Sequence, residues 1–332
     1  MQLIAEIAQA HDGSLGIAHS YIDALADAGV DAVKFQTHIA EAESSRHEPF
    51  RTNFSYEDET RFDYWNRMEF TPEQWGGLKK HCDDKNVEFL SSPFSNAAVD
   101  LLEKVGVKRY KIGSGEVNNF LLLRKIAETG KPIILSSGMS SFSELNRTMD
   151  FLSKYENDLS VLQCTTAYPT NPEQWGLNII TELKKRYDIP VGFSDHSGDI
   201  YACLAATSLG AEILEFHAVF DKQLFGPDAK ASLTIEKIKR LVRGVREIEL
   251  SLANKIDKNE NSQFNDLKNI FEKSLAVNKD LKKGAILQFS DLEAKKPKGL
   301  GIDASDFENI IGKKVKKELT KWEFLKTNHL HE

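Results

Sequence analysis

Short apolar segments rich in β-branched residues recur eight times in this 332-residue chain, and a stretch with helical spacing follows each one. Strand, helix and strand in regular alternation is the pattern of a parallel sheet that closes into a barrel. We therefore predict an α/β fold, a (β/α)8 TIM barrel. Its expected strands are residues 3–8, 32–37, 88–93, 109–114, 132–137, 161–166, 191–196 and 213–218.

The helical stretches carry start and end signals that agree with this alternation. Thr71 and Gln74 have the spacing of a capping box at the start of one helix. Ser141 and Glu144 have the same spacing at the start of another. Gly29 follows a helical run, at the position where a left-handed residue ends many helices.

The end of the chain predicts a second, smaller domain. Helical spacing follows the eighth strand over residues 233–252, and a polar stretch, 254–263, comes next. Beyond residue 270 the chain has only short strand-like pieces and turns, too few for the main catalytic body. We expect a TIM-barrel catalytic domain over 1–253, a linker over 254–269 and a small β-rich domain over 270–332.

One connection is longer than the others. Residues 38–70, after the second strand, are acidic and aromatic before the next helix begins. Loops that follow strands lie on the C-terminal face of a barrel, where such proteins build their substrate sites. We expect this insertion to border the active site.

Composition narrows the class of protein. The net charge is −7, which argues against nucleic-acid or anionic-membrane partners because these need a basic surface. No apolar run approaches the roughly 20 residues of a membrane span, and the N-terminus lacks the features of a signal peptide. Three scattered cysteines form no disulfide or zinc pattern, so we expect a cytoplasmic protein: Cys82, Cys164 and Cys203.

Polar side chains occur near the carboxyl ends of nearly all the expected strands. Burial of so many ionisable groups in a purely structural barrel is costly, so their presence favours a functional site at that mouth. Several are two residues apart and therefore share a face of their strand. The set comprises Glu6, Lys34, Gln36, Ser92, Lys111, Ser114, Ser136, Thr166, Tyr168, Ser194, His196, Glu215 and His217.

Two histidines end neighbouring strands. His196 ends the seventh strand and His217 lies on the eighth, and adjacent strands are about 4.8 Å apart, so both imidazoles can bind one divalent cation. Glu6 lies on the first strand, which adjoins the eighth on closure, and can join directly or through water. The alternative is a hydrogen-bonded histidine pair without metal. Asp195, of opposite parity, is the expected orienting partner of His196.

Lysines and hydroxyls recur around the same mouth. Lys34 and Lys111, together with four serines, suit a small, highly charged anion such as a phosphate-bearing acid. One lysine can instead act as a Schiff-base nucleophile. Both alternatives stay open on the residues alone.

At these residues the chain resembles the N-acetylneuraminate (sialic acid) synthase family, which includes legionaminic and pseudaminic acid synthases, over essentially its full length. The C-terminal stretches KSLAVNKDLKKGAIL, KKPKGLGI and IGKKV are similar to that family's antifreeze-like (SAF) domain. The barrel motifs that carry the resemblance are AEIAQAHDGSL, VKFQTH, FLSSPFS, YKIGSGEVNN, PIILSSGM, QCTTAYPT, GFSDHSGD and LEFH…FGPDAKASL.

The resemblance implies a transferase that condenses phosphoenolpyruvate with the aldehyde of an N-acylated hexosamine, giving a nine-carbon 2-keto acid and phosphate. It implies that His196 and His217 bind manganese or magnesium, and that a partner's SAF domain closes over the barrel in a domain-swapped homodimer. It further implies catalytic roles for Glu6, Lys34, Lys111 and Glu215, and substrate binding by Gln36, Ser92, Ser114, Ser136, Thr166, Tyr168, Ser194, Asp228 and Lys296.

The chain makes three departures from the family pattern. Thr166 stands where asparagine is common, and Lys296 stands where arginine usually precedes the proline. Ala218 and Val219 follow the second histidine in place of Phe-Thr. These changes leave the reaction class intact but leave the acceptor sugar open.

Two other functions compete with this one. A metal-free Schiff-base aldolase that uses Lys111 would be trapped by borohydride and would be indifferent to chelators. A non-catalytic sugar-binding barrel is the other, and the complete set of lysines, histidines and carboxylates argues against it.

Overall fold

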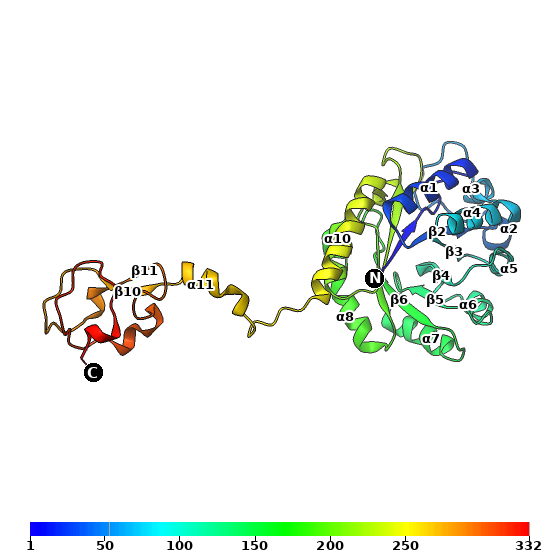
Figure 1. Ribbon diagram of the computed structural model, residues 1–332. Helices are drawn as coiled ribbons and strands as arrows, with labels where there is room; N and C mark the ends of the chain where they lie inside the picture. Colours follow the sequence, from blue (N-terminus) through cyan, green and yellow to red (C-terminus); the bar gives the residue numbers. More distant parts are fainter. Residues whose placement is uncertain (53, 332) are drawn as a thin grey trace. The chain divides into compact units, whose positions relative to one another are not determined.

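The computed structural model describes residues 1–52 and 54–331, which form two compact units, Met1–Asn254 and Lys255–Glu332. The first unit contains a ring of strands with helices around it (Figure 1). Within the described residues, no helix is both long enough and apolar enough to cross a membrane.

Eight parallel strands form the inner ring of the first unit, in the order β3-β2-β1-β8-β7-β6-β5-β4. β3 and β4 lie in contact and complete the ring, although no paired register joins them in the described part of the chain. The predicted TIM-barrel fold is confirmed. The strands are β1 Gln2–Glu6, β2 Ala32–Thr37, β3 Glu88–Pro93, β4 Tyr110–Ile112, β5 Ile133–Ser136, β6 Leu159–Cys164, β7 Val191–Asp195 and β8 Ile213–Val219.

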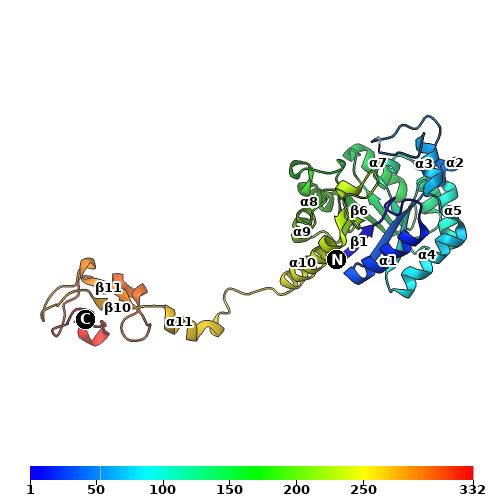
Figure 2. The same ribbon diagram turned by 90° about the horizontal axis from the view of Figure 1, so that it is seen from above.

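Helices surround this ring on the outside, as the view from above shows (Figure 2). The described residues of the predicted insertion after β2 contain two further helices, α2 Ala40–Glu43 and α3 Arg61–Met68. Short 3-10 turns lie at Ser114–Glu116, Pro172–Gln174 and Ala229–Ala231. The outer helices are α1 Leu15–Ala28, α4 Pro72–Asp84, α5 Asn96–Val105, α6 Phe120–Ala127, α7 Phe142–Leu152, α8 Leu177–Arg186, α9 Tyr201–Ser208 and α10 Ile235–Ala253.

The predicted helix boundaries have their expected chemistry. Thr71 and Ser141 each complete a capping box, and Gly29 takes a φ of 84° at the end of α1. The last barrel helix begins two residues later than the spacing predicts. Leu233 and Thr234 instead form a two-residue strand, β9, beside β8, and the Thr234 hydroxyl then accepts from the Lys237 amide as the helix cap.

The barrel interior is layered. An apolar cluster fills its lower part and is separate from the larger core between strands and helices. Each member of this cluster lies two residues before a residue of the cavity described below, on the same face of its strand. Strand alternation therefore puts an apolar floor directly beneath a polar layer. The cluster comprises Ile4, Ala32, Leu90, Ile134, Leu162 and Ile213.

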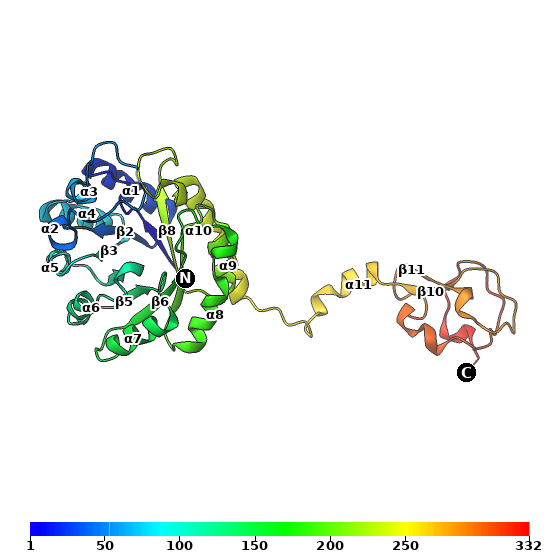
Figure 3. The ribbon, with the colours of Figure 1, turned by 180° about the vertical axis from the view of Figure 1, so that it is seen from behind.

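The second unit contains two antiparallel strands, β10 Ser274–Val277 and β11 Leu292–Lys295, with a small apolar core. Seen from behind, the strands and the helix α11, Asn265–Phe271, can be followed along the chain (Figure 3). Residues 265–269 of the expected linker are thus helical, and the helix continues to Phe271, because Leu267, Ile270 and Phe271 recur with helical spacing. Four 3-10 turns complete the unit: Ser262–Phe264, Phe289–Asp291, Ala304–Asn309 and Thr327–His329.

Candidate active site

A cavity of about 480 Å³ opens at the carboxyl ends of the barrel strands. Residues of the insertion after β2 form part of its wall, as the length of that connection predicts. The structure brings all the predicted site residues of the barrel into this lining: Glu6, Lys34, Gln36, Ser92, Lys111, Ser114, Ser136, Thr166, Tyr168, Ser194, His196, Glu215, His217 and Asp228.

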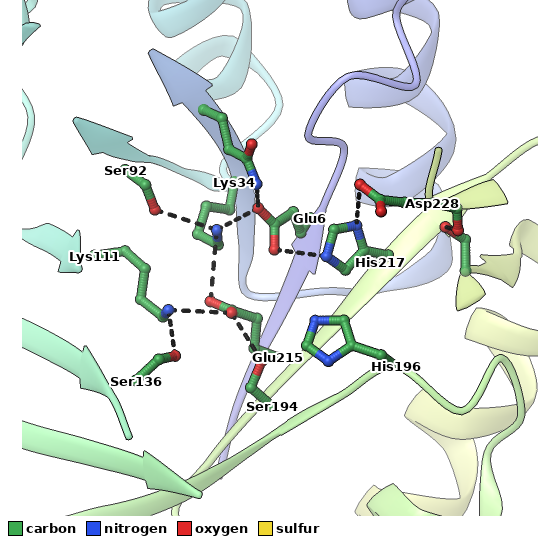
Figure 4. A network of polar contacts seen from close by, with 12 residues as sticks. Glu6, Lys34, Ser92, Lys111, Ser136, Ser194, His196, Glu215, His217 and Asp228 are labelled. Carbon is green, nitrogen blue, oxygen red and sulfur yellow. Dashed lines mark hydrogen bonds and ion pairs between the residues drawn. The ribbon is translucent and has the colours of Figure 1, made fainter. Parts of the chain in front are cut away.

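Two buried ion pairs meet at the floor of the cavity (Figure 4). Lys34 Nζ lies 2.6 Å from Glu6 Oε1 and 3.8 Å from Glu215 Oε2. Glu215 Oε1 lies 3.3 Å from Lys111 Nζ. All four side chains are at most 4% exposed, so each charge depends on its partners rather than on water for stabilisation.

Hydroxyl groups complete this network of charges. Lys111 Nζ donates to Ser136 Oγ at 2.6 Å, and Ser194 Oγ donates to Glu215 Oε1 at 3.0 Å. Lys34 Nζ lies 3.4 Å from Ser92 Oγ. Several N–H and O–H donors therefore converge on a space that is large enough for a small anion.

Both members of the Lys34–Glu6 pair are held in their charged forms. Burial opposes ionisation of Glu6, but Lys34, His217 and Lys111 outweigh it and hold the pKa of Glu6 far below its usual value. Burial likewise opposes the charge of Lys34, but Glu215 and Glu6 raise its pKa above the usual value. The amine of Lys34 is therefore protonated at neutral pH and is not a free nucleophile.

Lys111 makes the contacts of an ammonium group. Its Nζ has three acceptors in reach, namely Ser136 Oγ at 2.6 Å, the Ile112 carbonyl at 3.3 Å and Glu215 Oε1 at 3.3 Å. Three is the number of donors that a protonated lysine carries. This geometry disfavours a nucleophilic amine, which needs a free lone pair.

The two histidines lie side by side beyond the floor (Figure 4). Their ring centroids are 5.1 Å apart. The strand register puts Glu6 opposite His217, as closure of the barrel predicts, and His217 Nε2 lies 3.1 Å from Glu6 Oε2. Burial and the neighbouring His217 hold the pKa of His196 well below its usual value, so its imidazole is neutral.

Thr165 orients His196, and the expected role of Asp195 is wrong. Thr165 Oγ1 lies 2.8 Å from His196 Nδ1 and also accepts from the His196 backbone amide. Asp195 instead accepts two hydrogen bonds from Ser197, and burial raises its pKa to about 6. Successive side chains of a strand point to opposite faces, so the carboxylate of Asp195 is turned away from the barrel interior that His196 faces.

The donor set fits a divalent cation in part. Two imidazoles and a Glu6 oxygen converge, and the neutral form of His196 is the form that binds metals. No group of three or more histidine, cysteine or acidic side chains within the described residues is spaced to enclose an ion. A cation held here would need oxygen ligands from water or substrate.

The remaining predicted site residues lie along the cavity wall, and most contact the charged floor or the histidines. Gln36 Nε2 donates to Glu6 Oε1 at 2.6 Å, and Ser114 Oγ lies 3.4 Å from Cys164 Sγ. The Tyr168 ring centroid lies 4.0 Å from that of His196. Asp228 Oδ2 lies 4.0 Å from His217 Nδ1, which puts this predicted sugar contact beside the histidines.

Sequence reasoning missed a residue that joins the insertion to the barrel. His38 is buried, stacks against Trp65 and Phe94, and lies 2.6 Å from Glu43 Oε1 through Nδ1. Its Nε2 lies 3.2 Å from the side-chain oxygen of Gln36. The sequence contains a signal that could have indicated this residue, because His38 is two residues beyond Gln36, the spacing that other site residues share.

Sequence reasoning also missed Arg51. It lines the cavity and binds Asp228, which lies 177 positions away. No periodicity predicts such a contact.

The predicted site residue Lys296 lies in the second unit, where its Nζ is 4.9 Å from the centroid of the Phe271 ring.

The fold and cavity define a TIM barrel that carries its polar site at the carboxyl ends of the strands, as enzymes with this architecture do. The sequence profile of the NeuB family matches residues 21–257, more than half of the chain. This chain belongs to the NeuB family.

Individual relatives agree with this assignment. N,N'-diacetyllegionaminic acid synthase of Campylobacter jejuni is 36% identical over 317 residues, 94% of this chain and 94% of that protein. N-acetylneuraminate-9-phosphate synthase of Homo sapiens is 32% identical over 327 residues, 94% and 88% of the two chains. The crystal structure of the N-acetylneuraminic acid synthetase of Leptospira borgpetersenii covers 80% of this chain and 89% of its own, with a TM-score of 0.70 and 31% identity.

Proposed function

We propose that this protein condenses phosphoenolpyruvate with the open-chain aldehyde of an N-acylated hexosamine. The products are a nine-carbon 2-keto acid and phosphate. The observation that carries the proposal is the buried floor, where two lysines and several hydroxyls converge beside two histidines. The relatives named as synthases of diacetyllegionaminic acid and N-acetylneuraminate 9-phosphate support the reaction class.

The floor suits the carboxylate and phosphate of phosphoenolpyruvate. Lys34 and Lys111 supply charge, and Ser92, Ser136 and Ser194 supply hydroxyl donors; charge-assisted hydrogen bonds of this kind are the strong ones. On binding, the anion would take over lysine donors that now serve Glu6 and Glu215.

A divalent cation would complete the balance of charge. The two lysines are already matched by two carboxylates, so a multiply charged anion would bring uncompensated negative charge into a buried site. His196 and His217, with Glu6 nearby, are the residues that would hold manganese or magnesium. When bound, the cation would polarise the aldehyde oxygen as a Lewis acid.

The reaction forms one carbon–carbon bond and exchanges the phosphate oxygen on carbon 2 for an oxygen from water. Carbon 3 of phosphoenolpyruvate attacks the aldehyde carbon, whose oxygen becomes a hydroxyl group after proton uptake. Water adds to carbon 2, and the C2–O bond to phosphate breaks as the keto group forms. Glu6, which its cationic neighbours keep ionised, would orient the water, and Glu215 would accept its proton, since both carboxylates lie beside Lys34 Nζ.

The second unit would act as a SAF domain in this scheme. We propose that it closes over the barrel of a partner subunit in a domain-swapped homodimer and presents Lys296 to the sugar. Lysine supplies a point charge rather than the planar fork of arginine, so its contact with the sugar would be less directional.

Phosphate release from phosphoenolpyruvate tests the proposal. The assay would use a panel of 2-acetamido and 2,4-diacetamido hexoses as acceptors, with and without EDTA. Acceptor-dependent release that EDTA abolishes is the expected result. Release that survives EDTA together with borohydride trapping at Lys111 would favour the Schiff-base alternative, and no release with any acceptor would favour a binding function.

A further inference from the structure

Arg51 differs from the other cationic residues of the cavity. Four lysines and arginines line it in the described part of the chain. Lys34 and Lys111 are buried in the floor, and Arg61 pairs with Glu48 inside the insertion. Arg51 instead reaches out of the insertion, and its Nη2 lies 2.6 Å from Asp228 Oδ1.

Two contacts hold the Arg51 guanidinium in place, and they leave donors over within the part of the chain that the structure describes. Its carbon Cζ lies 4.2 Å from the centroid of the Tyr168 ring, a cation–π contact. Its side chain is 44% exposed, whereas that of Asp228 is 16% exposed. A guanidinium has five N–H donors, and among the described residues the Nη2 contact to Asp228 occupies one of them, so others remain for a ligand.

The distance from Asp228 to the histidines indicates which part of a ligand this pair would meet. Asp228 Oδ2 is 4.0 Å from His217 Nδ1, and Tyr168 packs on His196. In a 2-acylamino hexose the acylamino carbon is the direct neighbour of the aldehyde carbon. A sugar whose aldehyde lies at the histidines therefore brings its acylamino group close to Arg51 and Asp228.

We propose that Arg51 and Asp228 together recognise the acylamino group of the acceptor. A secondary amide offers one N–H donor and one carbonyl acceptor. The Asp228 carboxylate accepts from the N–H, and the Arg51 guanidinium donates to the carbonyl oxygen. This assignment rests on the proposed condensation and makes Arg51 a specificity-determining residue supplied by the same chain as the barrel.

The test compares two acceptors that differ only at carbon 2. One is the 2-acetamido hexose that the wild type uses best, and the other is its 2-hydroxy counterpart, used as a substrate or as a competitive inhibitor. In Arg51→Ala, kcat/KM for the acetamido sugar should fall roughly tenfold or more, since a hydrogen bond to a charged group is lost. For the 2-hydroxy sugar, kcat/KM as a substrate or the inhibition constant as an inhibitor should change less than about twofold. The KM for phosphoenolpyruvate should also change less than about twofold.

Two further variants separate recognition from folding. Arg51→Lys keeps the charge without the fork and should lose an intermediate amount of acetamido preference. Arg46→Ala removes an exposed arginine of the same insertion that does not line the cavity, and should match the wild type. Thermal melting of all variants would check their folding.

The outcomes are distinguishable. An acetamido preference that falls in Arg51→Ala but not in Arg46→Ala supports the assignment. An equal loss for both acceptors, or no loss, overturns it while leaving the condensation intact. A wild type that releases no phosphate with any acceptor overturns the proposed function itself, and the assignment of Arg51 with it.

Discussion

The floor and the mouth of the cavity are built in different ways. The floor consists of strand residues whose charges pair with one another at exposures of a few per cent, such as Lys34 with Glu6. The mouth is formed partly by the insertion, where Arg51 reaches Asp228 from a half-exposed position. Strands hold chemical groups within narrow limits, whereas loops tolerate substitution, so we expect the floor to carry the shared reaction and the mouth to select the sugar.

Replacement of a histidine beside the floor should have the largest effect. His217→Ala removes one of two proposed cation ligands and frees Glu6 Oε2 from its partner at 3.1 Å. Loss of one group that stabilises developing charge costs roughly a hundredfold to a thousandfold in kcat. Turnover and metal content would be measured together, with circular dichroism as the check on folding. Wild-type activity in the chelated variant would show that the metal assignment is wrong.

Removal of residues 264–332 tests whether the mouth is complete without the second unit. The barrel forms its own compact unit, Met1–Asn254, so the truncated protein should stay folded. We expect the rate of condensation to fall about a hundredfold, since misplacement of a substrate lowers the rate by about this factor. Steady-state kinetics and sedimentation would follow activity and subunit association. Undiminished activity would exclude the second unit from the site.

The floor itself is tested by Lys111→Ala, which removes a donor to Ser136 and the partner of Glu215. A contact of this type is worth roughly 1.5–3 kcal/mol, so KM for phosphoenolpyruvate should rise more than about tenfold. KM for the sugar should change less. Lys108→Ala, at an exposed position nearby, is the matched control. An unchanged KM with full turnover would contradict the role of Lys111.

The smallest expected effect concerns the stability of the chain beside the insertion. Burial, with smaller contributions from His38 and Arg67, lowers the pKa of His11 to about 3. The unfolded chain binds this proton more readily, so the wild type should lose stability as the pH falls from about 7 towards 3. Relative to His11→Gln, it should lose about 2 kcal/mol between pH 7 and pH 5. Urea unfolding at both pH values measures this, and parallel curves would refute the burial of a neutral His11.

The strand ends show how far sequence reasoning reached. The predicted segment 88–93 coincides with β3, and the observed β8 extends the predicted 213–218 by one residue. The expected strand 109–114 shortens to Tyr110–Ile112, because Ser114 begins a 3-10 turn. Local alternation predicts which face a side chain takes, and in a barrel the inner faces meet by closure.

Orientation within the site was harder to predict. Asp195 was expected to orient His196, but Thr165 does so from the neighbouring strand end. His38 and Arg51 were missed, since their partners lie across the chain or within the insertion. Contacts between loops follow from where the chain returns in space, and no local pattern encodes that.

The sequence by itself determined the barrel, its insertion and the layer of polar side chains above an apolar floor. Period-two alternation explains this, because residues two apart, such as Ile4 and Glu6, share the interior of the barrel. Only the tertiary structure decided which groups touch. The distances from Lys34 to two carboxylates, and from Arg51 to Asp228, depend on the closure of the ring and on long-range packing of the insertion.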